Sequence, residues 1–304
     1  MTLRDYVLAL FVVIIWGASF TAIRLGLDGV PPMLLASLRF LLVAFPAVLF
    51  VPRPAVHIRY WTAYGAAVGI GQFGCLFYAM HIGMPAGIAS VVMQSQAFFT
   101  FILAAALLKE SVTGSQLAGL GMAALGLSLV GHSNGLTEMH SVPLVAFLLS
   151  LAAAASWGFS NIVVKQMSAA SNAKRTLSML SVLVWSSLIP PIPLFLLALL
   201  LDTPATIFES ITSLEGLSLF SLGYLAFGST LFGFGTWSKL ISKYSPNVVA
   251  PLSLLVPVTG LLTARVVLDE RLSTTQWVGC AVVILGLGVT TFGFAQIQKW
   301  LRLG

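Results

Sequence analysis

Ten long apolar segments constrain the fold of this 304-residue chain more than any other feature. Each is close to the roughly 20 residues that a helix needs to cross a bilayer. Backbone polar groups inside lipid must bond within their own segment, so we expect the segments to be helices. The predicted spans cover residues 6–27, 33–51, 60–81, 86–108, 116–132, 143–167, 177–201, 217–239, 247–268 and 275–296.

Composition supports contact with a lipid bilayer over most of the chain. Hydrophobic residues make up 58% and charged residues only 8%, whereas soluble domains are about a quarter charged. The first apolar segment is long for a signal-peptide core and lacks a clear cleavage site, so we expect it to be retained. The prediction is an all-α integral membrane protein forming a single domain over residues 1–304.

Basic residues predict the orientation, because they gather on the cytoplasmic side of membrane proteins. The side that carries only Arg24 and Arg271, or three basic residues with Arg265, is therefore expected to be external. Both termini are then cytoplasmic, and the net charge of +6 needs no nucleic-acid partner to explain it. The eleven basic residues on the opposite side are Arg4, Arg53, Arg59, Lys109, Lys165, Lys174, Arg175, Lys239, Lys243, Lys299 and Arg302.

One segment occurs twice. Residues 108–127, "LKESVTGSQLAGLGMAALGL", and 268–287, "LDERLSTTQWVGCAVVILGL", share seven identical positions, among them Glu110 and Glu270. A weaker match joins "WGASFTAIR" at 16–24 to "WGFSNIVVK" at 157–165. The chain thus divides into repeats of five spans each, 6–132 and 143–296. Five is odd, so the second repeat enters the membrane from the other side, as in many secondary transporters.

Glycines within the duplicated segment indicate close helix packing. Gly119 and Gly126 are seven residues apart, as are Gly279 and Gly286, so each pair lies on one helix face. Small residues at such spacing let membrane helices approach closely. We interpret these positions as packing sites of the fifth and tenth spans.

Polar and aromatic residues at membrane depth mark candidate binding positions. Trp16 and Ser19 share a face of the first span, and Trp157 and Asn161 share a face of the sixth. Two interpretations stay open for each tryptophan: it fills a helix junction, or it forms an aromatic wall or gate beside polar groups. Polar groups inside a membrane favour a functional role.

The fourth span carries two polar faces, Ser90 with Gln94 and Gln96 with Thr100. Gln94 and Gln96 are two residues apart, which on a regular helix separates them by about 200° around the axis. We therefore expect only one of these faces to line a cavity and the other to bond to a neighbouring helix.

The ninth and third spans add further candidates. Ser253 lies between Pro251 and Pro257, where prolines loosen the helix, either as a bending gate or as a static kink. Gln72 of the third span is another cavity candidate. The predicted substrate-binding residues are therefore Trp16, Ser19, Gln72, Gln94, Gln96, Trp157, Asn161 and Ser253.

Arg39 is a charged residue within the second span, about 9 Å from the expected outer end at 1.5 Å per residue. We interpret it as a snorkelling side chain with a structural ion pair or a headgroup contact. Binding of a substrate carboxylate is the alternative.

The predicted spans lack the residues on which several classes of mechanism depend. The spans contain no Asp or Glu, and the four histidines lie in loops or near span ends. Proton relays usually need such groups, so their absence disfavours proton-coupled exchange. A metal site or an intramembrane enzyme lacks the groups it needs. Cys75 and Cys280 indicate no disulfide framework. The sequence has no P-loop for ATP, and no cofactor is expected.

Four stretches carry a family resemblance: "WGASF" (16–20), "LRFLLVAFPA" (38–47), "GMPAGIASVVMQSQAFFT" (83–100) and "APLSLLVPVTGLL" (250–262). With the duplicated segment, they resemble the ten-helix EamA-type transporters of the drug/metabolite transporter superfamily, in particular the branch of bacterial O-acetylserine/cysteine exporters. The resemblance implies a central cavity formed by spans one, three, four, six, eight and nine, with spans five and ten as supports.

The predicted function is export of small metabolites across the bacterial inner membrane, by alternating access between the repeats. Amino acids of the cysteine pathway, cysteine and O-acetylserine, are the expected substrates, since zwitterions suit neutral hydrogen-bonding groups and aromatic walls. Export of aromatic amino acids or drugs is the alternative on the same fold, and an intramembrane enzyme is a remote one. Proton coupling and facilitated movement both stay open. No pattern in the sequence specifies an oligomeric state.

Overall fold

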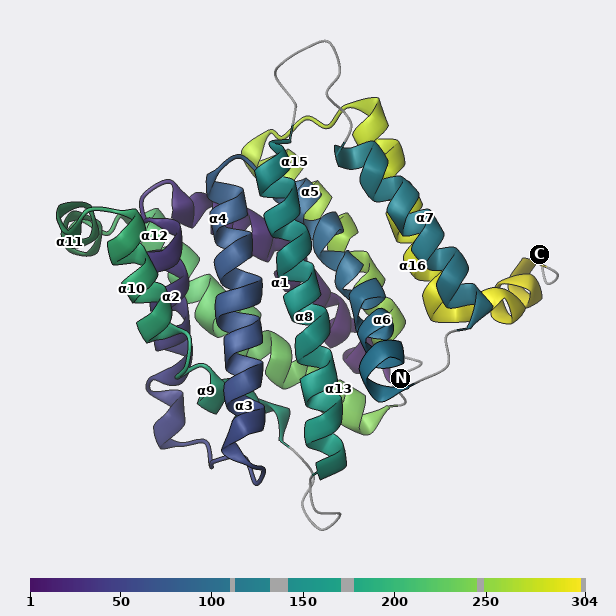
Figure 1. The fold of residues 1–304 in the computed structure, drawn as a ribbon, viewed down its shortest axis with the longest axis horizontal. Helices are drawn as coiled ribbons and strands as arrows, with labels where there is room; N and C mark the ends of the chain where they lie inside the picture. The colour runs from purple at the N-terminus through teal and green to yellow at the C-terminus, as the bar shows by residue number, and fades with distance from the viewer. Residues whose placement is uncertain (110–112, 132–141, 171–177, 245–248, 302–304) are drawn as a thin grey trace.

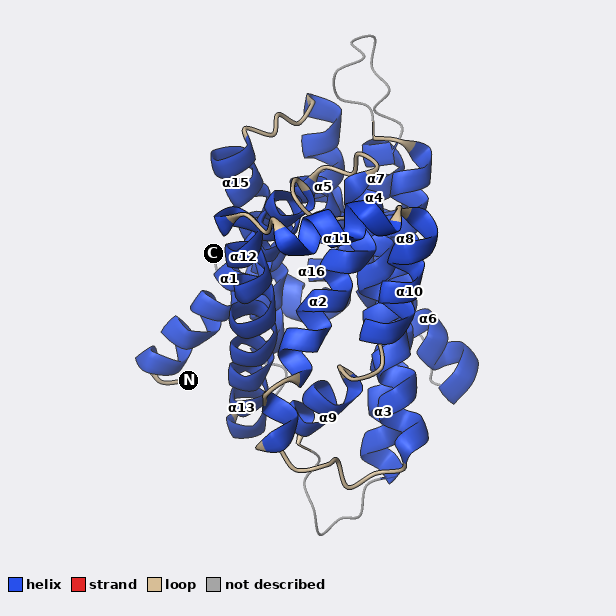
Figure 2. Ribbon diagram, turned by 90° about the vertical axis from the view of Figure 1, so that its left-hand side faces the viewer, coloured by secondary structure: helices blue, strands red, loops and turns tan. Residues whose placement is uncertain are grey.

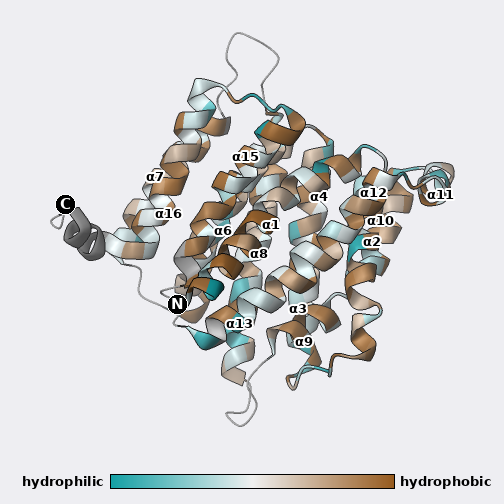
Figure 3. Cartoon of the chain, turned by 180° about the vertical axis from the view of Figure 1, so that it is seen from behind, coloured by the Kyte–Doolittle hydropathy of each residue, from teal (hydrophilic) through white to brown (hydrophobic). Residues whose placement is uncertain are grey.

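The computed structural model describes residues 1–109, 113–131, 142–170, 178–244 and 249–301. Within these ranges the chain is helical and contains no strand (Figure 2). Many of the exposed residues are large and apolar, as expected of a surface in contact with lipid. Hydrophobic residues recur along most of the helices (Figure 3). Glu110 and four of the basic or acidic loop residues, Glu138, Lys174, Arg175 and Arg302, lie outside the described residues.

In the first half of the chain α1 lies near the centre of the molecule and α7 lies at one edge, beside α16 (Figure 1). Proline at the first helical position begins α2, where its missing N–H costs nothing. The elements are α1 (Leu3–Leu27), α2 (Pro32–Ala44), η1 (Ala47–Leu49), α3 (Ile58–Gly65), η2 (Ala66–Gly74), α4 (Cys75–His81), α5 (Ala86–Val92), η3 (Met93–Ser95), α6 (Gln96–Leu108) and α7 (Gly114–Gly131).

The second half repeats this order, with the additional short helix α11 before its third apolar segment. Wide π-type turns occur in the middle of the third apolar segment of both halves, as η2 and η5. The elements are α8 (Leu144–Ala170), α9 (Met179–Ser186), α10 (Pro191–Leu201), α11 (Pro204–Thr212), α12 (Gly216–Gly223), η5 (Tyr224–Phe234), α13 (Gly235–Lys243), η6 (Ala250–Leu255), α15 (Val256–Leu268) and α16 (Thr274–Leu301).

Eight helical segments among the described residues are long and apolar enough to cross a membrane. They fall at the predicted spans one to four, six to eight and ten. Two shorter apolar helices, Gly114–Val130 and Leu252–Leu268, fall at the predicted spans five and nine. The chain therefore has eight candidate membrane spans, and a total of ten stays a prediction.

The duplicated segment forms the same local structure in both halves. Lys109 and Asp269, which follow the last residues of α6 and α15, both adopt left-handed backbone conformations, with φ of 56° and 51°. Four residues later a capping box begins: Gln116 accepts the backbone N–H of Thr113 at 2.8 Å, and Gln276 accepts that of Ser273 at 2.9 Å. The repeated letters therefore specify a helix end, a tight turn and the start of the next helix.

The glycines of this segment join α7 to α16, which pack side by side at one edge of the molecule (Figure 1). A Cβ on Gly119 would lie 2.6 Å from the carbonyl oxygen of Gly286, and a Cβ on Gly126 would lie 2.6 Å from that of Gly279. The predicted packing role of these glycines is confirmed. Because residue number rises along one helix as it falls along the other, the two helices are antiparallel, as an inverted relation between the repeats requires.

A second matched contact brings each Trp-Gly pair against the other repeat. Gly17 of α1 packs on Thr259 and Gly260 of α15, and Gly158 of α8 packs on Phe99 and Thr100 of α6. A Cβ on Gly17 would lie 2.7 Å from the backbone nitrogen of Gly260, and one on Gly158 would lie 3.0 Å from that of Thr100. Trp16 and Trp157 therefore each lie next to a close contact between the two halves of the chain.

Candidate functional site

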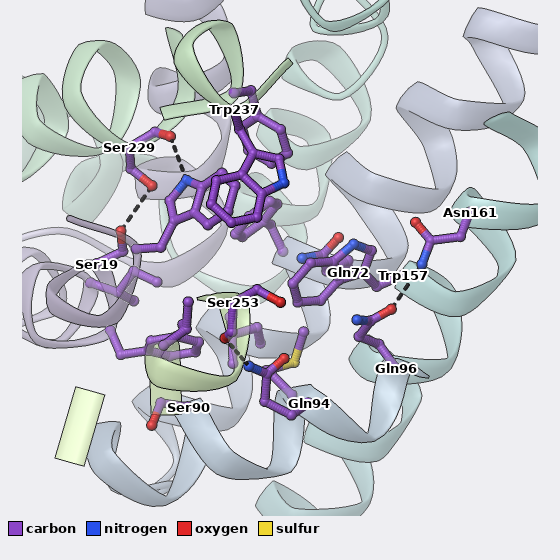
Figure 4. Close-up of a pocket in the computed structure, with 18 of the residues that line it drawn as sticks. Ser19, Gln72, Ser90, Gln94, Gln96, Trp157, Asn161, Ser229, Trp237 and Ser253 are labelled. Carbon is purple, nitrogen blue, oxygen red and sulfur yellow. Dashed lines mark hydrogen bonds between the residues drawn. The ribbon is translucent and has the colours of Figure 1, made fainter. Parts of the chain in front are cut away.

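A cavity of about 260 Å³ lies where the two halves of the chain meet (Figure 4). Its walls come from α1, from the third and fourth apolar segments, and from the matching elements α8, η5, α13, η6 and α15, with one residue from α2. Its lining residues are Trp16, Ser19, Phe20, Ile23, Arg39, Gln72, Phe73, Leu76, Ser90, Met93, Gln94, Gln96, Trp157, Asn161, Ser229, Phe234, Trp237, Ser253 and Val256.

All eight predicted site residues lie in this lining. The structure thus brings together side chains that are up to 237 positions apart, from Trp16 to Ser253, around one cavity. The elements that contribute them match those implied by the family resemblance, and neither α7 nor α16 contributes a residue. The eight residues line the same cavity, and their role in binding a substrate stays a prediction.

One wall is aromatic and joins α1 to the eighth apolar segment. The indole Nε1 of Trp16 donates to the carbonyl oxygen of Ser229 at 3.0 Å, and the Ser19 hydroxyl bonds to that of Ser229 at 2.8 Å. The Trp16 ring lies 5.2 Å from the ring of Phe234 and 5.1 Å from that of Trp237. Trp16 therefore fills a helix junction and also lines the cavity, and its role as an aromatic wall or gate for a substrate stays a prediction.

The fourth apolar segment crosses the cavity and presents both of its glutamines to it (Figure 4). Gln94 donates from Nε2 to the carbonyl oxygen of Ser253 at 3.2 Å on one side. On the other side, Oε1 of Gln96 accepts from Nδ2 of Asn161 at 2.8 Å. The expectation that only one face lines a cavity is wrong. The segment changes to a 3-10 turn at η3 and lies between η6 and α8, so opposite faces reach the same volume from different sides.

Asn161 links the sixth apolar segment to the fourth. Besides its bond to Gln96, its amide donates to the hydroxyl of Thr100 at 3.0 Å. The Thr100 hydroxyl in turn donates to the backbone oxygen of Gln96 at 2.7 Å. This network fixes the orientation of Asn161, and with it the polar part of the wall beside Trp157.

Gln72 and Ser229 occupy the wide turns of the two halves. Gln72 lies in η2, is buried, and lines the cavity beside Phe73. Ser229 lies in η5 and bonds to Trp16 and Ser19. Wide π-type turns are rare and occur often at functional sites. Their matching positions place a polar residue from each half at the cavity.

Arg39 lies in a different environment from the one expected. Its side chain is 1% exposed and lines the cavity, and no acidic residue among those described pairs with it. Its Nη2 donates to the Thr230 hydroxyl at 3.0 Å, and its Cζ lies 3.8 Å from the centre of the Phe73 ring. The interpretation as a snorkelling or ion-paired residue is wrong, because α2 turns this face toward η2 and η5 rather than toward lipid.

Several lining residues are missing from the predicted set. Ser229, Phe234 and Trp237 all come from the eighth apolar segment, which the family resemblance implies as a wall of the cavity. A signal existed for Ser229 alone: the third and eighth segments are equivalent in the two repeats, so the polar Gln72 in one predicts a polar residue in the other. Arg39 had a signal of its own, a charge within a predicted span.

Charge is scarce around the cavity. Among the lining residues that the structure describes, Arg39 is the only ionisable one, and the remaining polar groups are hydroxyls, amides and indole N–H groups. Such a lining can hold a small polar molecule through neutral hydrogen bonds and aromatic contacts.

Comparison with known proteins agrees with this architecture. The family model described as the EamA-like transporter family matches the chain twice, over residues 3–131 and 144–292. The chain is 45% identical to a probable amino-acid metabolite efflux pump of Escherichia coli strain K12, over 100% of both chains. It is 28% identical to a probable terminal-alkyne amino-acid exporter of Streptantibioticus cattleyicolor, over 90% of this chain and 89% of that one.

A solved structure titled "Crystal structure of protein" shares the fold. Its TM-score is 0.62 at 18% identity, and the match covers 95% of this chain and 96% of the other. The family, the relatives and the eight apolar helices place the protein in the bacterial inner membrane as a multi-pass transporter, not an enzyme. The two matched repeats and the full-length similarity establish that the chain belongs to the EamA-like transporter family, within the drug/metabolite transporter superfamily.

Proposed function

We propose that this transporter exports small amino-acid metabolites from the cytoplasm, with cysteine and O-acetylserine as substrates. The observation that carries the proposal is the cavity of about 260 Å³ between the repeats, lined by amides, hydroxyls and indoles. Its relatives named as an amino-acid metabolite efflux pump and an amino-acid exporter support the same substrate class.

Cavity size favours small metabolites over drugs. Pockets for drug-sized ligands occupy roughly 300–1,000 Å³, and this cavity lies below that range. A three-carbon amino acid is small enough for such a volume. The aromatic wall of Trp16, Phe234 and Trp237 is compatible with aromatic substrates. The volume therefore argues against drug-sized ligands, and a transport assay has to separate small from aromatic amino acids.

Alternating access between two inverted repeats is the proposed mechanism. Each repeat supplies one Trp-Gly helix, one wide turn and one half of the α7–α16 pair. Two similar halves packed in opposite orientations can exchange inward-open and outward-open states around a central site. In that scheme α7 and α16 stay together as a support while the helices around the cavity move.

Uptake into proteoliposomes tests the proposal. The purified protein would be reconstituted and given labelled cysteine or O-acetylserine, with and without an imposed pH gradient, and compared with protein-free vesicles. Saturable uptake, stimulated by unlabelled substrate inside and unchanged by the gradient, is expected, because the described lining holds no acidic residue or histidine to relay a proton. Failure of both substrates, alongside uptake of tryptophan or phenylalanine, would instead assign the transporter to aromatic amino acids.

A further inference from the structure

The guanidinium group of Arg39 is a buried cation with unused hydrogen-bonding capacity. Only Nη2 has a partner, the Thr230 hydroxyl at 3.0 Å. Nε and Nη1 are buried and have no hydrogen-bond partner in the described structure. The ring of Phe73 covers one face of the group at 3.8 Å. Two of the three guanidinium nitrogens therefore have no acceptor in the described structure, and the side chain that carries them lines the cavity.

A cation in such a place is expensive unless something neutralises it. Buried charges in proteins are paired or hydrogen-bonded, and a charge at membrane depth marks a functional site by default. Contact with Phe73, and at longer range with the rings of Phe40 and Phe77, offsets part of the cost. No carboxylate among the described lining residues supplies the rest. A bound anion would provide both the opposite charge and the missing acceptors.

Carboxylate is the anion whose chemistry matches a small metabolite in this cavity. Its two oxygens accept hydrogen bonds from guanidinium nitrogens, and such charge-assisted bonds are about twice as strong as neutral ones. The opposite end of an amino acid has no such partner: the described lining contains no negative charge for an ammonium group, only neutral oxygens such as those of Gln72 and Gln94.

Resting on the proposed function, we propose that Arg39 binds the carboxylate of the substrate, and that a free carboxylate is required for transport whereas a free amino group is not. Substrates of this protein are then small carboxylates that include amino acids, and acids whose nitrogen is acylated are accepted. Arg39 has no arginine or lysine counterpart in the seventh apolar segment, residues 177–201, so the carboxylate binds on the side of the first repeat.

A matched set of four thiols tests this on the wild-type protein: cysteine, N-acetylcysteine, cysteamine and cysteine methyl ester. The first two keep the carboxylate, and the last two lack it or mask it. Each would be measured as a competitor of labelled cysteine uptake and as a stabiliser of the purified protein against heat. We expect cysteine and N-acetylcysteine to act in both assays. Cysteamine and the methyl ester should be weaker by about 10- to 100-fold, the value of a hydrogen bond to a charged group.

Variants of Arg39 assign the effect to this residue. Arg39→Gln should remove the preference for carboxylates, and Arg39→Lys, which keeps the charge but not the planar group, should restore part of it. Arg24→Gln is the matched control, because Arg24 pairs with Asp28 at 3.4 Å, is partly exposed, and does not line this cavity. It should keep the wild-type order of the four thiols.

The outcomes separate this inference from the proposed function. Equal action of cysteamine and cysteine, or stabilisation by neither carboxylate, would overturn the role of Arg39, even where cysteine is transported. If cysteine competes and stabilises but N-acetylcysteine does neither, a free amino group is required, and that part of the proposal is overturned. Stabilisation by the two carboxylates alone, in a protein that transports neither cysteine nor O-acetylserine, would refute the proposed substrates and support the role of Arg39. Where Arg39→Gln does not fold, the wild-type series decides by itself.

Discussion

The carboxylate of Glu270 accepts the backbone N–H of Gly87 at 2.9 Å, and so ties the second repeat to the first. Its other oxygen accepts the N–H of Ala86 at 2.7 Å. These are the first two residues of α5, whose N-cap residue Pro85 offers no side-chain acceptor. A residue 184 positions away therefore caps the helix that carries Ser90 and leads to Gln94, and its negative charge faces the positive end of the helix dipole.

Replacing Glu270 with alanine should destabilise the protein by about 1–2 kcal/mol, the usual cost of a lost helix cap. Glu270→Gln, which keeps one acceptor and loses the charge, should fall between alanine and wild type. The midpoint of thermal unfolding in detergent measures both. Glu215→Ala is the matched control, since Glu215 precedes α12 without a side-chain capping bond. Equal losses for Glu270→Ala and Glu215→Ala would contradict the capping role.

Asp269, the left-handed residue at the second of the two matched turns, should tolerate glycine but not valine. Asp269 has φ of 51°, a conformation that costs a β-branched residue roughly 1–2 kcal/mol and glycine almost nothing. We expect Asp269→Val to lower the unfolding midpoint clearly and Asp269→Gly to leave it near that of wild type. The ion pairs of Asp269 with Arg265 and Arg271 are exposed, so their loss is common to both variants and small. A glycine variant as unstable as the valine variant would show that these pairs matter more than the backbone.

Gly119 should tolerate no side chain. Its Cβ would lie 1.9 Å from Oγ1 of Thr290 and 2.6 Å from the backbone oxygen of Gly286, which cannot move without separating α7 from α16. Gly119→Ala should therefore cost about 1–3 kcal/mol, as overpacking usually does. Gly121→Ala on the same helix meets nothing within 4 Å, and should be neutral or stabilising through helix propensity. The midpoint of thermal unfolding measures both variants. Equal midpoints for Gly119→Ala and Gly121→Ala would disprove the close contact at Gly119.

Removing the amide of Asn161 should impair transport while the fold persists. Asn161→Leu leaves Gln96 and Thr100 without their donor and turns a polar part of the cavity wall apolar. A loss of about 1 kcal/mol per hydrogen bond predicts a decrease in kcat/KM for cysteine uptake on the order of tenfold. Phe159→Leu, an exposed position on the same helix, is the control and should transport normally. If the double variant Trp157→Ala, Asn161→Leu stayed folded with full transport, the cavity would not be the binding site.

The sequence determined the helices and the repeat because both depend on local properties. A run of about 20 apolar residues must satisfy its own backbone bonds in lipid, so the position of each helix follows from composition. The turn and the capping box after Leu108 and Leu268 are equally local, and the glycine spacing was enough to predict that the fifth and tenth spans pack closely on a neighbour. That each is the neighbour of the other came from the structure.

Only the tertiary structure decided what surrounds each polar group. Helical periodicity correctly places Gln94 and Gln96 on different faces, but whether both faces reach one cavity depends on η6 and α8, which lie on either side of them. Arg39 was recognised as a charged residue within the second apolar segment, yet its environment comes from Phe73 and Thr230, 34 and 191 positions away. A helix face is a property of one segment, whereas the dielectric, the partners and the volume next to that face belong to its neighbours.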